Sequence, residues 1–149
     1  MTVRSRPLPV AGFTLVELMV TIVIAAMLLA IAVPSYTSQV RKSRRTEARS
    51  AVMDLAAREE RYFSVNNAYS FNDVDLGYGT VNAQIKDLAV GSGYYTVTVT
   101  TPVTATGQAG FNIVAQAVGT QAKDATCLLF AVDQTGKQTS APSATGCWN

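Results

Sequence analysis

GFTLVE, residues 12–17, opens the stretch that decides the fold, and the apolar run LMVTIVIAAMLLAIAV follows it from Leu18 to Val33. The run holds one hydroxyl, on Thr21, and no charge. Counted from Phe13 to Val33, it would form an α-helix about 32 Å long. The hydrocarbon core of a bilayer is about 30 Å thick, so the sequence predicts one membrane-spanning helix.

Glu17 places a carboxylate in the first turns of this predicted helix. A charged side chain at the centre of a membrane helix costs about 2.5–3.5 kcal/mol, and less near the interface. Acids at such positions usually have a partner, and a helix N-terminus favours negative charge. We therefore predict a functional partner for Glu17, with an interfacial acid of no special role as the alternative.

The residues before the apolar run differ from an ordinary secretory signal. Arg4 and Arg6 supply a basic start, but the small residue, Gly12, precedes the apolar run. A secretory signal has its small-residue cleavage site after that run. Cleavage after Gly12 would remove only a polar leader, residues 1–12, and leave the membrane helix on the mature chain.

The pattern Gly-Phe-Thr-Leu-x-Glu, followed by a spanning run, Pro34 and Tyr36, resembles the class III signal of type IV pilins and their relatives. The resemblance implies that a membrane aspartyl protease, the prepilin peptidase, cuts between Gly12 and Phe13 and N-methylates Phe13. It also implies that Glu17 pairs with the N-terminal amine of a neighbouring filament subunit. An uncleaved signal anchor carrying a soluble domain explains neither Glu17 nor the Gly12–Phe13 junction.

Helical periodicity continues beyond the membrane run. Apolar residues recur at close to i, i+3, i+4 spacing from Ala48 to Phe63, which is typical of an amphipathic helix. We expect one helix from Phe13 to about Ser64, kinked at Pro34 because proline lacks an N–H and clashes with the preceding turn. Its first half needs lipid or other helices, and its second half needs a sheet to pack on.

Charged residues cover the remaining faces of the second half. Acidic and basic side chains are interleaved, so we expect ion pairs at helical spacing; the acids are Glu47, Asp54, Glu59 and Glu60. A basic cluster, Arg41, Lys42, Arg44 and Arg45, lies close to the membrane end of the helix. It would suit anionic lipid or DNA, but the favoured interpretation is a solvated face paired with nearby acids. The positive-inside rule alone would place this flank in the cytoplasm.

The second half of the chain predicts a small antiparallel sheet. Residues 65–93 are rich in Asn, Asp and Gly and predict a loop, in which Asp73, Asp75 and Asp87 lack the spacing of a known calcium loop. Strands are predicted at 95–100, where apolar and hydroxyl residues alternate, at 111–118 and at 127–133, with a short fourth strand near 138–140. Residues 106–110 and 133–137 are predicted turns.

Composition narrows the function. The sequence has no histidine, which excludes His-based acid–base chemistry and His metal ligands. Nothing resembles a nucleophile–base pair or a metal cluster, so we expect no enzyme, no cofactor and no metal. The net charge of +2 comes from the leader arginines, which leaves a neutral mature chain with no general argument for DNA. Cys127 and Cys147 predict a disulfide in an exported head, with two free buried thiols as the alternative.

The whole layout resembles a type IV pilin, which implies an α+β fold. A long, kinked N-terminal helix, half transmembrane and half amphipathic, would pack on a small antiparallel sheet with a disulfide-closed C-terminal loop. The expected divisions are a removed leader at 1–12, a transmembrane and filament-core helix at 13–36, and a periplasmic or extracellular head at 37–149. The chain would sit in the inner membrane as a single-pass protein and later join an extracellular pilus.

Two stretches resemble one subgroup more closely. Residues 45–48 with 56–63 and Tyr69, and the ending Cys147-Trp148, are similar to the PilE-type minor pilins of Gram-negative bacteria. The resemblance implies a minor pilin that primes pilus assembly for twitching motility or adhesion. Its partners would be the prepilin peptidase, major and minor pilins, the inner-membrane assembly platform and the bilayer. A major pilin, a pseudopilin of a type II secretion system and a DNA-capturing pilin are the alternatives.

Overall fold

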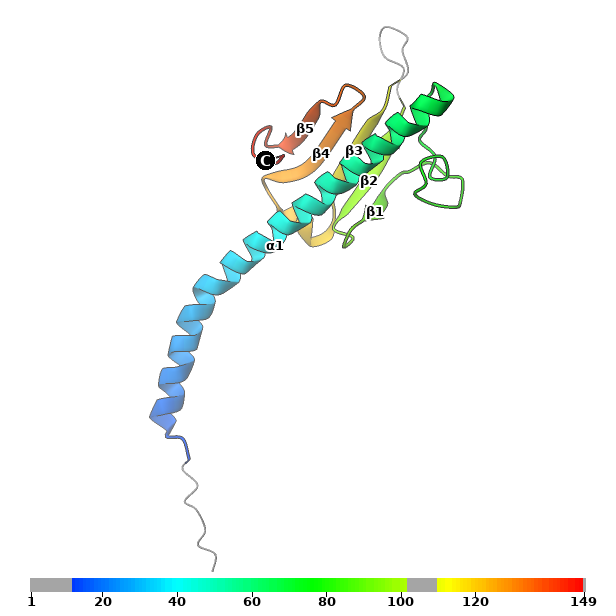
Figure 1. Ribbon diagram of the computed structural model, residues 1–149. Helices are drawn as coiled ribbons and strands as arrows, with labels where there is room; N and C mark the ends of the chain where they lie inside the picture. Colours follow the sequence, from blue (N-terminus) through cyan, green and yellow to red (C-terminus); the bar gives the residue numbers. More distant parts are fainter. Residues whose placement is uncertain (1–11, 102–109, 149) are drawn as a thin grey trace, which may run out of the picture. The chain divides into compact units, whose positions relative to one another are not determined.

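The protein is described here from a computed structural model that covers residues 12–101 and 110–148. It contains one long helix, α1 (Leu15–Asn66), one short 3-10 helix, η1 (Gly119–Lys123), and five strands. The strands are β1 (Leu88–Val90), β2 (Tyr95–Thr100), β3 (Asn112–Ala117), β4 (Cys127–Asp133) and β5 (Gln138–Pro142). Two compact units divide at residues 38 and 39: the apolar part of α1, and a head formed by the rest (Figure 1).

The apolar unit is helical from Leu15 onward, so the helix predicted from Phe13 begins two residues later. Pro34 lies inside α1, which continues through it. Beyond the proline, the hydroxyls of Thr37 and Ser38 donate to the carbonyls of Pro34 and Ser35, at 3.0 and 2.9 Å. Hydroxyls bonded back to the preceding turn often bend a helix, as does proline. The kink at Pro34 stays a prediction.

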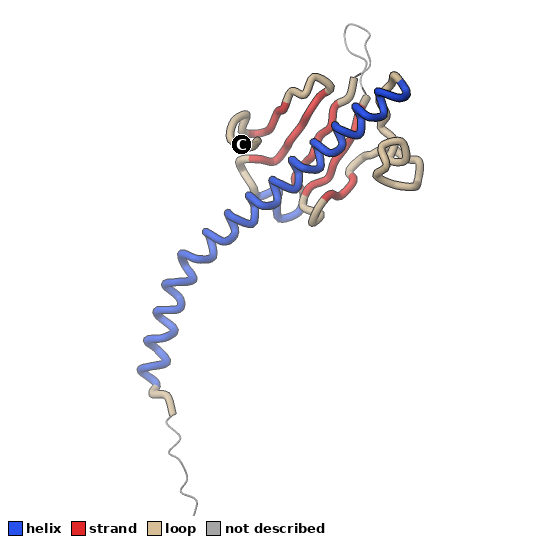
Figure 2. The backbone as a smooth tube through the Cα atoms, viewed as in Figure 1, coloured by secondary structure: helices blue, strands red, loops and turns tan. Residues whose placement is uncertain are grey.

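In the head, the second half of α1 lies across one face of the sheet (Figure 2). The buried positions Ala48, Val52, Leu55 and Glu59 recur at spacings of four, three and four, which places them on one stripe of the helix. Full burial of a valine or leucine side chain contributes about 1.5–3 kcal/mol, so this stripe attaches the helix firmly to the sheet. The amphipathic second half predicted from the sequence is confirmed.

The sheet is an antiparallel meander in the order β1-β2-β3-β4-β5. Alternate residues of each central strand enter the core beneath α1; they are Tyr95, Val97 and Val99 of β2, Ile113, Ala115 and Ala117 of β3, and Phe130 and Val132 of β4. The hydroxyl residues between them in β2 are only partly buried or exposed, as the sequence alternation predicts. The chain therefore has an α+β fold with one core layer between helix and sheet.

Two elements differ from the sequence prediction. β1 lies in the stretch predicted as loop, and η1 connects β3 to β4, so the sheet has five strands instead of three or four. Leu88, Ala89 and Val90 form a strand because they pair with Val97, Thr96 and Tyr95 of β2, a contact that no local pattern announces. The predicted turn at 106–110 and the leader at 1–12 lie mostly outside the described residues.

Candidate anchor and assembly surface

The N-terminal end of α1 carries a hydrogen-bonded cap. The Glu17 backbone N–H donates to the Thr14 hydroxyl at 3.2 Å, and the Leu18 N–H donates to the Thr14 carbonyl at 3.2 Å. Thr14 and Glu17 thus have the Thr-x-x-Glu spacing of a capping box, which is a sequence signal for a helix start two residues after Phe13. Gly12 and Phe13 precede the helix, so the predicted cleavage junction lies outside α1.

Glu17 is exposed on the first turn of α1. Within the described ranges, neither ion pair involves this carboxylate. A lone carboxylate gains about 0.3–1 kcal/mol from a helix N-terminus in water, which is small against the cost of desolvating a charge. Transfer of this end of the helix into an apolar environment therefore calls for a cation from elsewhere.

The helix from Leu15 to Val33 exposes apolar side chains on all sides. Its only hydroxyl, on Thr21, donates to the Leu18 carbonyl at 2.8 Å and is thereby satisfied within the helix. By length and composition, α1 is the one described helix that is apolar enough to cross a membrane. A soluble monomer rarely exposes so large an apolar surface, so this unit is built to face lipid or other helices.

The basic cluster of α1 is divided among different partners. Arg45 forms an ion pair with Asp124, which follows η1, with Nε–Oδ2 at 2.6 Å and Nη2–Oδ1 at 2.7 Å. Arg44 lies with its guanidinium 3.3 Å from the ring centroid of Tyr94 and donates to the Thr120 hydroxyl. The sequence prediction of a solvated face is therefore wrong for Arg44 and Arg45, because both contact the sheet side of the head.

The Arg45–Asp124 pair belongs to a buried polar network. Gln121 donates to Asp124 Oδ2 at 3.1 Å and to the Tyr95 hydroxyl at 3.3 Å, and that hydroxyl donates to the Cys127 carbonyl at 2.9 Å. Burial alone would raise the pKa of Asp124, but the bonds from Arg45 and from backbone N–H groups outweigh it and lower the pKa. The network ties α1, η1 and β4 together beside the disulfide.

Cys127 and Cys147 form a disulfide, as predicted, across a sequence separation of 20. It ties the first residue of β4 to the C-terminal segment, and both cysteines are buried. Trp148 continues this closure: its indole N–H donates to the Thr139 carbonyl at 2.9 Å, and its ring meets Phe130 edge-on at 5.5 Å. The described C-terminal segment therefore covers part of edge strand β5.

Glu59 differs most from its predicted environment. It was expected on the charged side of α1, but it is fully buried. Its Oε2 accepts the Ser70 N–H at 3.0 Å, while Oε1 has no partner among the described atoms. Burial raises its pKa to about 7, with smaller contributions from the nearby carboxylates of Glu60 and Asp75. Of the ion pairs expected along the helix, the structure forms Asp54–Arg58.

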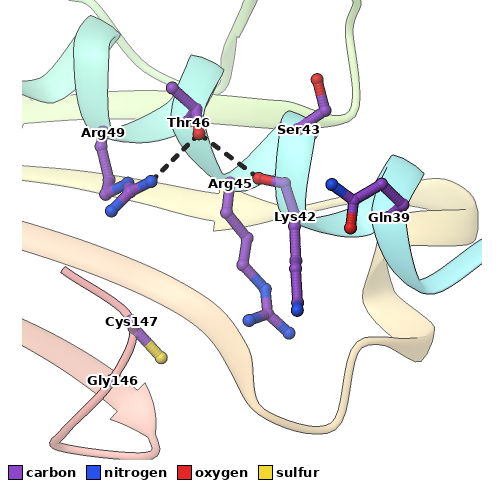
Figure 3. A pocket seen from close by; sticks show the side chains of 8 residues that line it. All are labelled: Gln39, Lys42, Ser43, Arg45, Thr46, Arg49, Gly146 and Cys147. Atoms are coloured by element: carbon purple, nitrogen blue, oxygen red, sulfur yellow. Dashed lines mark hydrogen bonds between the residues drawn. The ribbon is translucent and has the colours of Figure 1, made fainter. Parts of the chain in front are cut away.

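A polar pocket of about 720 Å³ lies wholly in the head, between α1 and the disulfide-closed segment. One side of α1 from Gln39 to Arg49 lines it, and Gly146 and Cys147 form the opposite wall (Figure 3). In the same view, Lys42, Arg45 and Arg49 extend from the helix on the side of that wall. Three of the described side chains that line this pocket are therefore cationic.

Asp73 and Asp75, two of the three acids in the predicted loop, have structural partners. The Asp73 carboxylate accepts N–H groups of Val81 and Ala83, and the carboxylate of Asp75 accepts the Ser70 hydroxyl. No group of three or more His, Cys, Asp or Glu in the described ranges is placed to hold a metal ion. These acids therefore order the segment between α1 and β1.

Comparison with known proteins places the chain in a family. Residues 34–131, about two thirds of the chain, match the family model described as "Type IV minor pilin ComP, DNA uptake sequence receptor". Residues 9–33 match the prokaryotic N-terminal methylation motif. The two matches together run from the predicted cleavage junction into β4.

Two individual proteins are also similar to this chain, one over a shorter segment and one at lower sequence identity. The type IV major pilin protein PilA of Myxococcus xanthus is 33% identical over 67 residues, which are 45% of this chain and 30% of that protein. A type IV pilin structure from Shewanella oneidensis aligns over 73% of this chain and 98% of its own, with 24% identity and a TM-score of 0.48. On the family match, the chain belongs to the type IV minor pilin family.

Proposed function

We propose that the protein acts as a minor pilin in the assembly or priming of a type IV pilus. The observation that carries the proposal is the construction of α1. Its first unit exposes an apolar surface with a single carboxylate, Glu17, and its second half forms the spine of the folded head. This construction suits a subunit that is stored in a membrane and then transferred into a helical bundle. Motility and adhesion would follow from the filament.

Maturation is the first step of the proposal. The prepilin peptidase would cut between Gly12 and Phe13 and methylate the new N-terminus at Phe13, leaving residues 13–36 as the filament-core helix and 37–149 as the head. Two observations support this: residues 9–33 match the methylation motif, and the junction precedes the helix instead of lying within it. A cut at this point keeps the Thr14 cap and all of α1.

Glu17 would then pair with the N-terminal amine of Phe13 in a neighbouring subunit. A carboxylate without a cation is costly in an apolar filament core, and a methylated amine remains a cation. Glu17→Gln keeps the size of the side chain and the Thr14 cap but removes the charge. It should leave cleavage and membrane insertion intact and lower incorporation into filaments by about tenfold or more. Thr21→Val, in the same apolar unit, serves as the control.

We infer that the head lies on the periplasmic side before assembly. Support comes from the Cys127–Cys147 disulfide, because disulfides form in oxidising compartments. The basic cluster after the membrane run opposes this orientation by charge alone. Digestion of the head by external protease in spheroplasts, with protection in intact cells, would support the orientation. Protection in both would reverse it.

Abundance and phenotype separate the proposal from its alternatives. A major pilin would dominate sheared filaments, whereas a minor pilin would be a trace component. A pseudopilin would be processed but absent from surface pili, and its deletion would impair secretion. The match to a major pilin covers less than half of this chain, so it does not favour the first alternative.

DNA capture is the second candidate, because the matched family model is described as a DNA uptake sequence receptor. From residue 39 onward the chain has ten Lys and Arg against nine Asp and Glu, so the head is close to neutral. Double-stranded DNA carries one charge per about 1.7 Å and is bound through many phosphate contacts. Retention of duplex DNA by the purified chain, weakening steeply with salt, would favour this candidate.

A further inference from the structure

The pocket between α1 and the C-terminal segment has more cationic lining than the fold needs. Lys42, Arg45 and Arg49 contribute to it, and no carboxylate is among the lining residues that the structure describes. We propose that this pocket binds the phosphate of an anionic phospholipid headgroup while the subunit is held in the bilayer. The proposal does not depend on filament assembly.

Lys42 supplies the available charge. Its ammonium makes no hydrogen bond or ion pair with any residue of the ranges 12–101 and 110–148, and its side chain is exposed. Arg45, in contrast, is neutralised by Asp124, whose side chain is only 3% exposed. Arg49 donates to the Thr46 hydroxyl at 3.0 Å. A phosphate diester beside Lys42 would thus meet an ammonium that no described residue neutralises.

The pocket also offers neutral donors. Ser43 contributes a hydroxyl, and Gln39 contributes a side-chain amide. A headgroup phosphate accepts several hydrogen bonds at once, and charge-assisted bonds to Lys or Arg are about twice as strong as neutral ones. At about 720 Å³, the pocket has room for a phosphate with its glycerol.

The place of the pocket in the chain favours lipid over other phosphates. Lys42 follows Val33, the last residue of the apolar run, by nine positions, or about 14 Å along a helix. The headgroup layer extends roughly 5–8 Å beyond the hydrocarbon on each side. Helical side chains lean toward the N-terminus, and a lysine stem reaches further in that direction, which is the direction of the apolar run along the helix.

Long DNA suits the same surface less well. Binding to a duplex needs a row of cations, yet the neighbouring Arg44 lies against Tyr94, and Arg58 bonds to Asp54 and the Leu76 carbonyl. A small group of cations near a membrane anchor is instead the arrangement that recognises anionic lipid. Lipid binding would also explain why basic residues follow the membrane run, although their charge alone disfavours export of the head.

The test uses the full chain in a non-ionic detergent, titrated with dihexanoylphosphatidylglycerol or with dihexanoylphosphatidylcholine, and followed by native mass spectrometry. We expect the anionic lipid to bind at least about tenfold more tightly than the zwitterionic one. Lys42→Gln should weaken the anionic lipid about fivefold, as removal of one cation near an anionic surface does. Lys137→Gln, at an exposed lysine of the β4–β5 turn, should leave it unchanged.

Two further ligands test whether the pocket recognises a lipid headgroup, free phosphate or DNA. Inorganic phosphate at the same concentration should bind much more weakly than the anionic lipid, and a short DNA duplex should not displace the lipid. Equal binding of both lipids, or no effect of Lys42→Gln, would overturn the proposal. Tight binding of free phosphate or of duplex DNA would also overturn the proposal if that binding depended on Lys42 and the two lipids bound with equal affinity. Unchanged circular dichroism of the variant shows that the head remains folded.

Discussion

Arg45 of α1 and Asp124, 79 residues later in the sequence, share two charge-assisted hydrogen bonds of 2.6 and 2.7 Å. Asp124 is almost fully buried and Arg45 is largely so. The pair joins the helix to the segment between η1 and β4, and it lies in the same network as Gln121 and Tyr95. It is the most buried electrostatic link between helix and sheet among the described residues.

Removal of Arg45 should therefore destabilise the head. Arg45→Gln leaves the Asp124 carboxylate buried without its cation, which lowers the free energy of unfolding by about 3 kcal/mol. Lys42→Gln, three positions earlier on the same helix, removes an exposed charge that has no partner among the described residues, and it should change stability by less than about 0.5 kcal/mol. Urea unfolding of the detergent-solubilised chain measures both; equal stabilities of the two variants would contradict the assignment.

The Arg45–Asp124 pair should also make the free energy of unfolding of the head depend on pH in the acidic range. Its net effect holds the pKa of Asp124 below its usual value. Because the folded pKa is lower than the unfolded value of about 3.9, the stabilisation is present above that value and is lost as pH falls through the folded pKa. Below about pH 4, wild type should approach the stability of Asp124→Asn. A gap between the two that persists at pH 2 would show that the charge is not responsible.

Glu59 predicts the opposite slope near neutral pH. Its folded pKa of about 7 lies above its unfolded value of about 4.5. The folded state therefore binds the proton more tightly, and the free energy of unfolding falls as pH rises between these values, by up to about 3 kcal/mol. Glu59→Gln keeps an acceptor for the Ser70 N–H and should flatten this decline. Parallel curves for wild type and variant between pH 5 and 8 would refute the prediction.

The disulfide should stabilise the head substantially. For a loop of this size, a cross-link contributes about 3 kcal/mol by restricting the unfolded chain. Reduction with dithiothreitol should lower the free energy of unfolding of wild type by about that amount. A variant carrying both Cys127→Ala and Cys147→Ala should be less stable and insensitive to the reductant. If wild type were equally insensitive, the head would not depend on this closure.

Gly91 is required by two constraints, and Gly93 by one. Both have positive φ, at +55° and +80°, but a Cβ on Gly91 would lie 2.5 Å from Glu47 Oε2, whereas a Cβ on Gly93 meets nothing within 4 Å. That Glu47 oxygen accepts both the N–H and the hydroxyl of Ser92. Gly93→Ala should cost about 1 kcal/mol and Gly91→Ala about twice that. Thermal unfolding compares them, and equal costs would remove the role of Glu47.

The sequence predicted those helices and strands whose own residues show a clear hydrophobic pattern. The helix and strand β2 were predicted from the apolar run of residues 18–33 and from the alternation of apolar and hydroxyl residues between Tyr95 and Thr100. Both elements are present in the structure. Burial in β2 follows that alternation residue by residue. β1 escaped prediction because its three residues form a strand only through pairing with β2, next to Asp87 in a left-handed conformation.

Most polar contacts of the head could not be predicted from the sequence. Nothing near Asp124 indicates that Arg45 will reach it, because the pairing depends on how α1 lies on the sheet. Glu59, however, left a usable signal. It continues the spacing of Ala48, Val52 and Leu55, so helical periodicity alone placed it on the buried stripe. A charge in such a stripe should have been predicted as buried.

The central claim is that this chain enters a type IV pilus as a minor subunit that begins at Phe13. Quantitative intact-mass spectrometry of sheared surface filaments tests it most directly. We expect a trace species that lacks residues 1–12 and carries one added methyl group. The same species as the dominant component, or a processed chain that is absent from filaments, would contradict it.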